Sequence, residues 1–182
     1  MWAYLVGSIK WQAQMFEEMR DVVGLMQTAK VYAGWLLRRP EVKLRVKCVS
    51  TPVYCRPATS DRKVLVQIFQ ERDCDVDLKT APSLIIDGGA NVGYSSLFLA
   101  NKYPEAEILA VEPDVENANQ IRKNCATYPN IRVVQGGIWT RREPLYIANP
   151  DAKKWAFQLR ASPSGTTEAE ATSNSVLYIV LR

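Results

Sequence analysis

Leu84–Gly93 reads LIIDGGANVG, an apolar run that passes directly into a glycine-rich turn. The segment that follows, about Tyr94–Tyr103, predicts a helix. An uninterrupted apolar run is typical of a strand that is buried on both faces of a parallel sheet. A glycine turn between such a strand and a helix lets a ligand approach the backbone, and the helix N-terminus favours anionic groups. The stretch therefore predicts a strand, a ligand-binding turn and a helix.

The segments after this turn continue the alternation of strands and helices. Further strands are expected at Glu107–Val111 and Ile131–Val134, and a helix at about Val115–Ala126 that Asp114 caps. Strand, helix, strand, helix and strand is the pattern of a parallel sheet covered by helices. The predicted fold class is therefore α/β with a mostly parallel sheet.

The last third of the chain departs from this alternation. Pro144–Ala148 and Trp155–Arg160 predict a hairpin, and the apolar run Val176–Leu181 predicts one more strand. The strand at Leu84–Ile86 needs a neighbour on each side, and the strand at Glu107–Val111 supplies only one. We therefore expect the terminal strand either to fill the vacant edge or to pair with a second chain. In the second case the chain would associate with itself through a sheet edge.

The overall composition is that of a folded domain. The chain has 182 residues, of which 47% are hydrophobic and 23% are charged, and its net charge is +4. These values exclude disordered and low-complexity classes. Histidine is absent, which excludes imidazole bases, Ser-His-Asp triads and His-ligated metals. No nucleic-acid partner is expected.

The cysteines give no sign of a metal site or a disulfide framework. The four of them are scattered and form no CxxC pair: Cys48, Cys55, Cys74 and Cys125. No metal is therefore expected, and free thiols favour a reducing compartment such as the cytoplasm. No apolar stretch reaches the roughly 18 residues that a membrane-spanning helix needs.

The first part of the chain predicts a helix followed by a small strand-and-helix preface. We expect this preface in residues 1–80 and a cofactor-binding domain in residues 81–182. Short strands are predicted at Val42–Val49 and Val53–Arg56, and a further helix is predicted from about Arg62 to Gln70.

An apolar stripe runs along the N-terminal helix, which Pro40 ends. Its members recur at steps of four and three and so share one face: Met15, Met19, Val22, Met26, Ala29, Ala33 and Leu36. Gly24 and Gly34 weaken the helix. The simplest expectation is one helix that packs this face on a core.

The alternative is a helix that lies on a membrane surface or binds a partner. Three tryptophans favour it: Trp2, Trp11 and Trp35. A basic cluster follows the helix: Arg38, Arg39, Lys43, Arg45 and Lys47. Such a cluster suits phosphates or an anionic membrane, and it is equally typical of a solvated basic turn. Both interpretations stay open at this point.

Two acidic residues, Asp87 and Glu112, end neighbouring predicted strands. Glu112 comes about 20 positions after Gly93, the spacing at which a carboxylate accepts hydrogen bonds from a ribose diol. A dinucleotide would want G-x-G-x-x-G, but counting from Gly88 the third position is Ala90. Asp87 would also repel a pyrophosphate, whereas it suits S-adenosylmethionine, which carries an ammonium and a cationic sulphur. A nicotinamide-dependent oxidoreductase is therefore the weaker hypothesis.

The motif DGGANVGYSS at Asp87–Ser96, followed by AVEPD at Ala110–Asp114, resembles the FkbM-type family of S-adenosylmethionine-dependent methyltransferases. VYCRPATSDRKVLVQIF at Val53–Phe69 is similar to the segment before the cofactor domain in that family. The likeness covers about residues 42 to 160. It implies a Rossmann-like fold and methyl transfer to a hydroxyl oxygen of a sugar or small molecule. Family members usually continue into a fourth strand with a motif like L-K-I-D-x-E-G-x-E. Nothing of that kind follows Arg160, so an incomplete C-terminal half is expected.

The resemblance also implies a set of cofactor-binding residues: Asp87, Gly89, Ala90, Asn91, Gly93, Glu112, Pro113, Asp114, Gln135 and Gly136. Asp87 and the turn would line the methionine part, Glu112 would hold the ribose, and the others would surround the adenine. The catalytic base stays unassigned among carboxylates, lysines and tyrosines. A module that binds the cofactor without turnover, or that contacts a membrane, is the alternative from another class.

The preface motif has two interpretations of its own. Arg56, Thr59, Ser60 and Asp61 match the family segment and would either shape the mouth of a pocket or hold the local structure. In the structural interpretation, which we favour, Asp61 caps a helix and Arg56 pairs with an acid.

Overall fold

The computed structural model describes residues 2–138, 145–149, 151, 158–161 and 177–179, and it describes the side chains of residues 10–138, 145–149, 151 and 158–160. The chain divides into two compact units, Met1–Asp77 and Leu78–Arg182. Each unit is described by itself below. None of the helices in the described ranges has the length and apolarity to cross a membrane.

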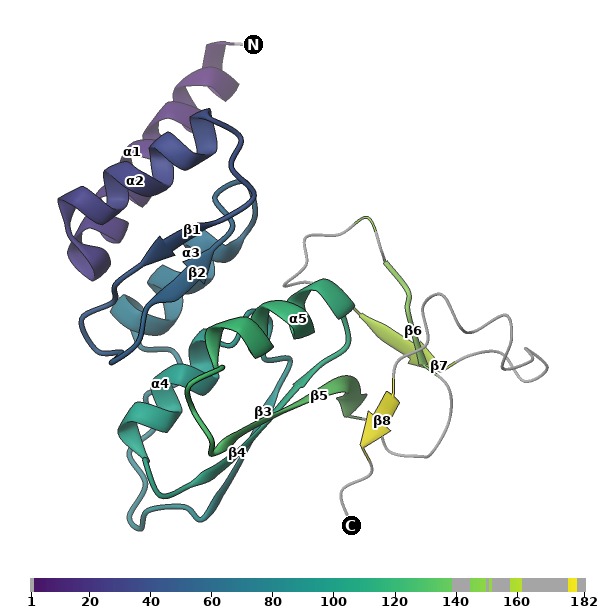
Figure 1. Ribbon diagram of the computed structural model, residues 1–182. Helices are drawn as coiled ribbons and strands as arrows, with labels where there is room; N and C mark the ends of the chain where they lie inside the picture. The colour runs from purple at the N-terminus through teal and green to yellow at the C-terminus, as the bar shows by residue number, and fades with distance from the viewer. Residues whose placement is uncertain (1, 139–144, 150, 152–157, 162–176, 180–182) are drawn as a thin grey trace. The chain divides into compact units, whose positions relative to one another are not determined.

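The N-terminal unit begins with two helices rather than the single predicted one. Helix α1 covers Trp2–Val23 and helix α2 covers Leu25–Leu36, and they lie side by side (Figure 1). Gly24 separates them with a φ of 84°, a left-handed conformation that an ordinary helix residue does not adopt. The ring of Phe16 on α1 meets the ring of Tyr32 on α2 edge to face at 5.2 Å.

The break at Gly24 overturns the prediction of one continuous apolar face. The α1 half of the stripe is buried, as Met15 and Met19 show. The α2 half points to solvent, where Met26 is 84% exposed and Leu36 is 73% exposed. The chain reverses direction at the glycine, so the spacing rule that holds within one helix does not carry over to the next.

The buried side of α2 is instead formed by small and polar residues: Thr28, Val31 and Gly34. Gly34 explains the close approach of the following strand, because a Cβ at this position would come within 2.6 Å of Val42 Cγ1. Helix α2 therefore packs through its narrowest side chains.

A two-stranded antiparallel sheet and a helix complete this unit. Strand β1 (Val42–Leu44) pairs with β2 (Val53–Cys55), and the chain continues into α3 (Asp61–Val66) and the short π-helix η1 (Gln67–Glu71). The predicted strands and helix are present here, the strands shorter than expected. The Arg62 guanidinium lies 5.4 to 5.8 Å from the centres of three aromatic rings: Trp11, Tyr32 and Trp35.

The C-terminal unit has the predicted α/β Rossmann-like fold. Its parallel strands are β3 (Leu84–Gly88), β4 (Glu107–Glu112) and β5 (Ile131–Ile138). Helices α4 (Tyr94–Lys102) and α5 (Val115–Asn124) connect them and run along one side of the sheet (Figure 1). The strand order, β3-β4-β5-β8, places β3 at one edge of the described sheet.

Two predictions about this sheet are wrong. Strand β3 is not buried on both faces, because none of its five residues is fully buried and its Leu84 is 56% exposed. The terminal strand β8 (Leu177–Ile179) does not fill the edge beside β3 but pairs in parallel with Gly136–Ile138 of β5. Residues 176, 180 and 181 of the predicted strand lie outside the described ranges.

A predicted hairpin follows the parallel strands. Strands β6 (Leu145–Ile147) and β7 (Leu159–Ala161) pair antiparallel, as the sequence predicted. Residues 144 and 155–157 of that prediction lie outside the described ranges. The four cysteines are free, and in the described part of the chain no cluster of three or more acidic or cysteine side chains could hold a metal ion.

Candidate functional site: the carboxyl ends of β3 and β4

The parallel register brings the two predicted acidic residues to the same edge and the same face of the sheet. Asp87 lies opposite Ala110, and Glu112 follows Ala110 by two positions on the same strand. Because side chains alternate along a strand, residues two apart face the same side. Gln135 of β5 lies opposite Glu112. The two carboxylates therefore occupy neighbouring strand ends, as predicted.

Asp87 is held by the first turn of α4. Its Oδ2 accepts hydrogen bonds from Ser95 Oγ at 2.7 Å and Ser96 Oγ at 2.6 Å. The side chain is only partly buried, and both of the described hydrogen bonds go to the same oxygen. A carboxylate next to a helix N-terminus is also favoured by the positive end of the helix dipole. Asp87 is thus fixed in place and keeps Oδ1 as an acceptor.

The turn between β3 and α4 has three residues with positive φ: Gly89 at 77°, Asn91 at 51° and Gly93 at 83°. The backbone N–H groups of Gly89 and Ala90 donate to Val111 O at 2.9 and 3.0 Å, which ties the turn to β4. A Cβ added at Gly89 would meet nothing within 4 Å, so this glycine borders open space.

Gly93 has a different role from Gly89. A Cβ at Gly93 would lie 3.0 Å from Ile121 Cγ2 and 3.2 Å from Cys125 Sγ. This glycine therefore lets α4 begin close against α5, a packing role rather than a ligand-facing one. Burial and the negative charge of Asp87 raise the pKa of the Cys125 thiol to about 12, so this cysteine stays protonated.

Glu112 lies inside the turn and is only 4% exposed. Its Oε2 accepts from the backbone N–H of Asn91 at 2.9 Å, and its Oε1 accepts from the backbone N–H of Asp114 at 3.0 Å. Asn117 Nδ2 lies 3.4 Å from Oε1. All of these donors are neutral. Burial outweighs them and raises the pKa of Glu112 to about 7.

Asn91 carries an unsatisfied acceptor at the centre of this arrangement. The residue is buried, and its Oδ1 has no hydrogen-bond partner among the described residues. Buried polar atoms are normally paired, so an orphaned one calls for an explanation such as a missing ligand. A donor on a bound molecule would satisfy it.

The remaining predicted residues lie around these groups. Asp114 caps α5, because its Oδ1 accepts from the backbone N–H of Asn117 at 2.8 Å, as predicted. Pro113 joins it to Glu112. Gln135 and Gly136 do not follow the strand, as the predicted strand end at Val134 implied, but lie within β5. The reason is that β5 continues to pair, first with β4 and then with β8.

Four residues near the site were not singled out from the sequence: Ser95, Ser96, Asn117 and Ile138. The two serines had a detectable signal, since hydroxyl side chains in the first helical turn after an acidic strand end can donate back to it. Ile138 had none. Its Cδ1 would lie 2.7 Å from a Cβ at Gly88, a contact that only the fold creates.

The preface motif forms its own buried ion pair in the N-terminal unit. Arg56 Nε and Nη2 donate to the two oxygens of Asp61, each at 2.9 Å, and Asp61 is fully buried. Arg56 therefore pairs with an acid, as predicted. Asp61 does not cap the helix: it is the first residue of α3, with Ser60 at the N-cap, and its carboxylate turns back to Arg56.

Comparison with known proteins finds no matching family model but does find similar chains. The chain is 43% identical over 75 residues to Methyltransferase sdnD of Sordaria araneosa. This match covers 40% of this chain and 29% of that protein. They are 32% identical over 85 residues to Methyltransferase 1 of Beauveria bassiana, covering 46% of this chain and 34% of that protein.

A bacterial protein is also similar. The malonyl-(acyl-carrier protein) O-methyltransferase of Halalkalibacterium halodurans is 30% identical over 91 residues, covering 50% of this chain and 31% of that protein. The match thus spans about a third of the length of each relative. All three are named methyltransferases, which supports a methyltransferase family for the matched part of this chain.

Proposed function

We propose that the chain binds S-adenosylmethionine at the carboxyl ends of β3 and β4 and belongs to a methyltransferase of the FkbM type that acts on a hydroxyl of a sugar or small molecule. The observation that carries this proposal is the pair of carboxylates, Asp87 and Glu112, on one face of neighbouring strand ends beside the orphaned acceptor of Asn91. The names of the relatives support the reaction class.

The residues at this edge suit a cationic ligand with several donors. Asp87 Oδ1 and Asn91 Oδ1 are acceptors that an ammonium group can satisfy. Neither carboxylate receives a described hydrogen bond from a lysine or an arginine. A pyrophosphate would meet two negative charges here, which disfavours a dinucleotide.

Glu112 has two tasks in this proposal. Its hydrogen bonds to the backbone N–H groups of Asn91 and Asp114 hold the turn in shape. A carboxylate oxygen has more than one lone-pair site, so Glu112 can also accept from a ribose hydroxyl. A cationic ligand nearby would favour its charged form and lower its raised pKa.

Bound S-adenosylmethionine would supply the methyl group, and the chain would supply position. Transfer from a sulphonium needs the acceptor oxygen held in line and water excluded. The acceptor hydroxyl also needs a group that takes its proton.

A module that binds the cofactor without turnover is the second candidate. Binding with methyl transfer to a hydroxyl acceptor supports the first candidate, and binding without transfer supports the second.

Titration calorimetry with S-adenosylmethionine tests the site. We expect Glu112→Gln to weaken binding by about 10- to 100-fold, the usual loss for a hydrogen bond to a charged group. Glu107→Gln is the matched control, since Glu107 begins the same strand and is exposed. Unchanged affinity in Glu112→Gln, or equal loss in both variants, would contradict the assignment.

A further inference from the structure

Helix α2 exposes an apolar surface. Five exposed residues recur at helical spacing on one side of it, and we call them the apolar face of α2: Leu25, Met26, Ala29, Ala33 and Leu36. A surface helix normally buries its apolar side and exposes its polar side. Helix α2 departs from this arrangement, because it exposes this apolar row while Thr28 and Gly34 are among the residues that it buries.

Helix α1 shows the normal arrangement in the same unit. It buries Met15 and Met19 and exposes Gln14, Glu17 and Asp21. Among the side chains of α1 that the structure describes, from residue 10 to residue 23, Trp11 is the one large apolar residue that is exposed, so they form no comparable apolar row. A contiguous exposed apolar patch marks a surface that meets something apolar, either a protein or a membrane.

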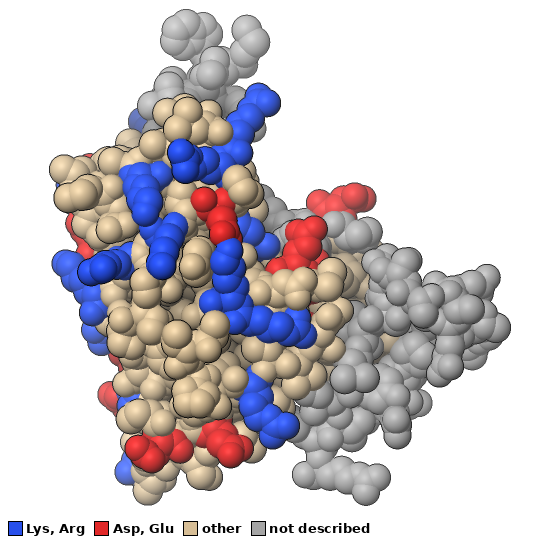
Figure 2. Space-filling model, in the orientation of Figure 1, with Lys and Arg blue, Asp and Glu red and all other residues tan. Residues whose placement is uncertain are grey.

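Exposed basic residues lie on α2 and on the segment that follows it. Lys43 stands between the buried Val42 and Leu44 of β1, and Arg45 and Lys47 are exposed further along the chain. Lys30 Nζ donates to the backbone O of Lys43 at 2.7 Å, which places β1 next to α2. We call the six exposed basic residues of this part of the chain the basic rim: Lys30, Arg38, Arg39, Lys43, Arg45 and Lys47. Figure 2 shows Lys and Arg side chains gathered over the N-terminal unit.

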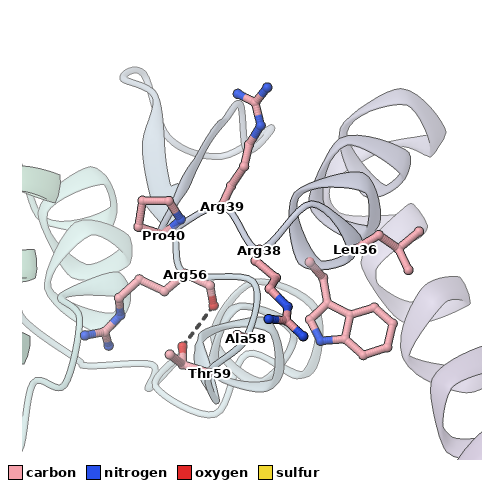
Figure 3. A pocket seen from close by; sticks show the side chains of 8 residues that line it. Leu36, Arg38, Arg39, Pro40, Arg56, Ala58 and Thr59 are labelled. Carbon is pink, nitrogen blue, oxygen red and sulfur yellow. Dashed lines mark hydrogen bonds between the residues drawn. The ribbon is translucent and has the colours of Figure 1, made fainter.

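A cavity of about 690 Å³ opens at the C-terminal end of α2. Its lining combines apolar and basic groups: Trp35, Leu36, Arg38, Arg39, Pro40, Arg56, Ala58 and Thr59. Figure 3 shows Arg38 directed towards Ala58, whereas Arg39 extends the other way. In the described part of the chain, no carboxylate forms an ion pair with Arg38 or Arg39.

We propose that α2 docks the N-terminal unit on an anionic lipid bilayer. The apolar face enters the boundary between headgroups and acyl chains, and the basic rim binds headgroup phosphates. Apolar burial combined with attraction to anionic lipids is the basis of binding for helices that lie in the membrane surface. Trp35, partly exposed next to the rim, suits the headgroup level, where aromatic side chains are enriched.

The charges argue for a bilayer over a second copy of the chain. A symmetric contact through α2 would bring one basic rim against another, and like charges across an interface are unfavourable. The only acidic residue between positions 25 and 47 is Glu41, so this segment has few negative charges that could neutralise the basic rim of a second copy. An anionic bilayer supplies negative charges opposite the basic rim.

Flotation of the full chain with lipid vesicles tests the proposal. We expect binding to vesicles of phosphatidylcholine mixed with phosphatidylserine, much weaker binding to phosphatidylcholine alone, and loss of binding as the salt concentration rises. No binding to the anionic vesicles, or equal binding to both kinds, would overturn it.

Two alanine variants separate the apolar face from general charge effects. Ala33→Glu places a carboxylate in the middle of the face, and Ala13→Glu places one on the exposed side of α1. Both change the net charge equally. We expect Ala33→Glu to weaken binding to anionic vesicles by about ten-fold and Ala13→Glu to have a much smaller effect. Equal effects would overturn the role of the face.

Arginine variants test the rim. Arg39→Ala should weaken vesicle binding by about five-fold, since each basic residue near an anionic surface contributes about that much. Arg20→Ala on α1 is the control and should leave binding unchanged. Sedimentation of the wild type and of each variant tests whether a second copy of the chain covers the face instead. If the wild type self-associates and Ala33→Glu abolishes this self-association, a second copy rather than a bilayer covers the face.

Discussion

The two units of the chain each bury a carboxylate, and they treat it in opposite ways. Asp61 in the N-terminal unit is 0% exposed and receives two hydrogen bonds from the Arg56 guanidinium, both at 2.9 Å. Glu112 in the C-terminal unit is 4% exposed and receives its hydrogen bonds from backbone N–H groups and an amide. One negative charge is neutralised inside the fold and the other is not.

The difference separates a structural charge from a binding charge. A buried ion pair that is complete needs no further partner, and it stabilises the turn between β2 and α3. A buried carboxylate that only neutral donors contact has its pKa raised, here to about 7, and a cation would lower it again. Burial with raised pKa and no counter-ion is typical of functional sites.

The largest expected effect is the loss of the N-terminal ion pair. Arg56→Ala leaves Asp61 buried without its cation, which should lower the free energy of unfolding of this unit by about 3–5 kcal/mol. Denaturant unfolding followed by tryptophan fluorescence measures it. Arg20→Ala breaks the exposed pair with Asp21 and should cost less than about 1 kcal/mol. Similar losses in both variants would remove the contrast between the two carboxylates.

The pH dependence of the C-terminal unit gives the next largest effect. The pKa of Glu112 is about 7 in the folded chain and about 4.3 in an unfolded one. The folded state therefore binds more protons in this range, so stability falls as the pH rises from about 4.3 to 7. The fall attributable to Glu112 should be on the order of 3 kcal/mol.

Unfolding measured across this pH range in wild type and Glu112→Gln isolates that contribution. Glutamine cannot titrate, so the decline should be smaller in the variant. Its amide nitrogen cannot accept the second of the two backbone hydrogen bonds, so the variant should also be less stable than the wild type at low pH. A variant that declines as steeply as the wild type would show that Glu112 is not the titrating group.

The smallest expected effect concerns the support of the ion pair. Thr59 Oγ1 donates to Arg56 O at 2.9 Å and accepts from the backbone N–H of Asp61 at 3.2 Å. Thr59→Val removes both hydrogen bonds and should lower the free energy of unfolding by about 1 kcal/mol, well below the Arg56→Ala loss. If Thr59→Val cost as much as Arg56→Ala, the turn rather than the charge pair would hold this region, as denaturant titration would reveal.

Much of the C-terminal fold could be predicted because its signals are local. The apolar run at Leu84–Ile86, the glycine turn and the Asp114 cap each lie within a few residues, and each appears where expected. The strand at Ile131–Val134 was predicted too short. Gly136 and Gly137 resemble a turn, yet pairing with β8, about 40 positions later, keeps them in the sheet.

The N-terminal helices show why the same kind of signal can fail. The heptad-like spacing from Met15 to Leu36 is regular, and the sequence alone has no information on which way the chain leaves Gly24. A φ of 84° at that residue sends the second half of the stripe to solvent. Periodicity predicts that residues share a face of a helix, but it does not predict what covers that face.

The amino-acid sequence by itself determined the order of strands and helices from Leu84 to Asn124, the placement of Asp87 and Glu112 at strand ends, and the need of Arg56 for an acidic partner. These features depend on residues close together in the chain. Only the tertiary structure decided which carboxylate keeps a counter-ion, which acceptor of Asn91 stays unsatisfied and which side of α2 is exposed. Burial and charge pairing depend on contacts between segments far apart in sequence, such as Glu112 with the Asn91 backbone, and those contacts exist only once the chain has folded.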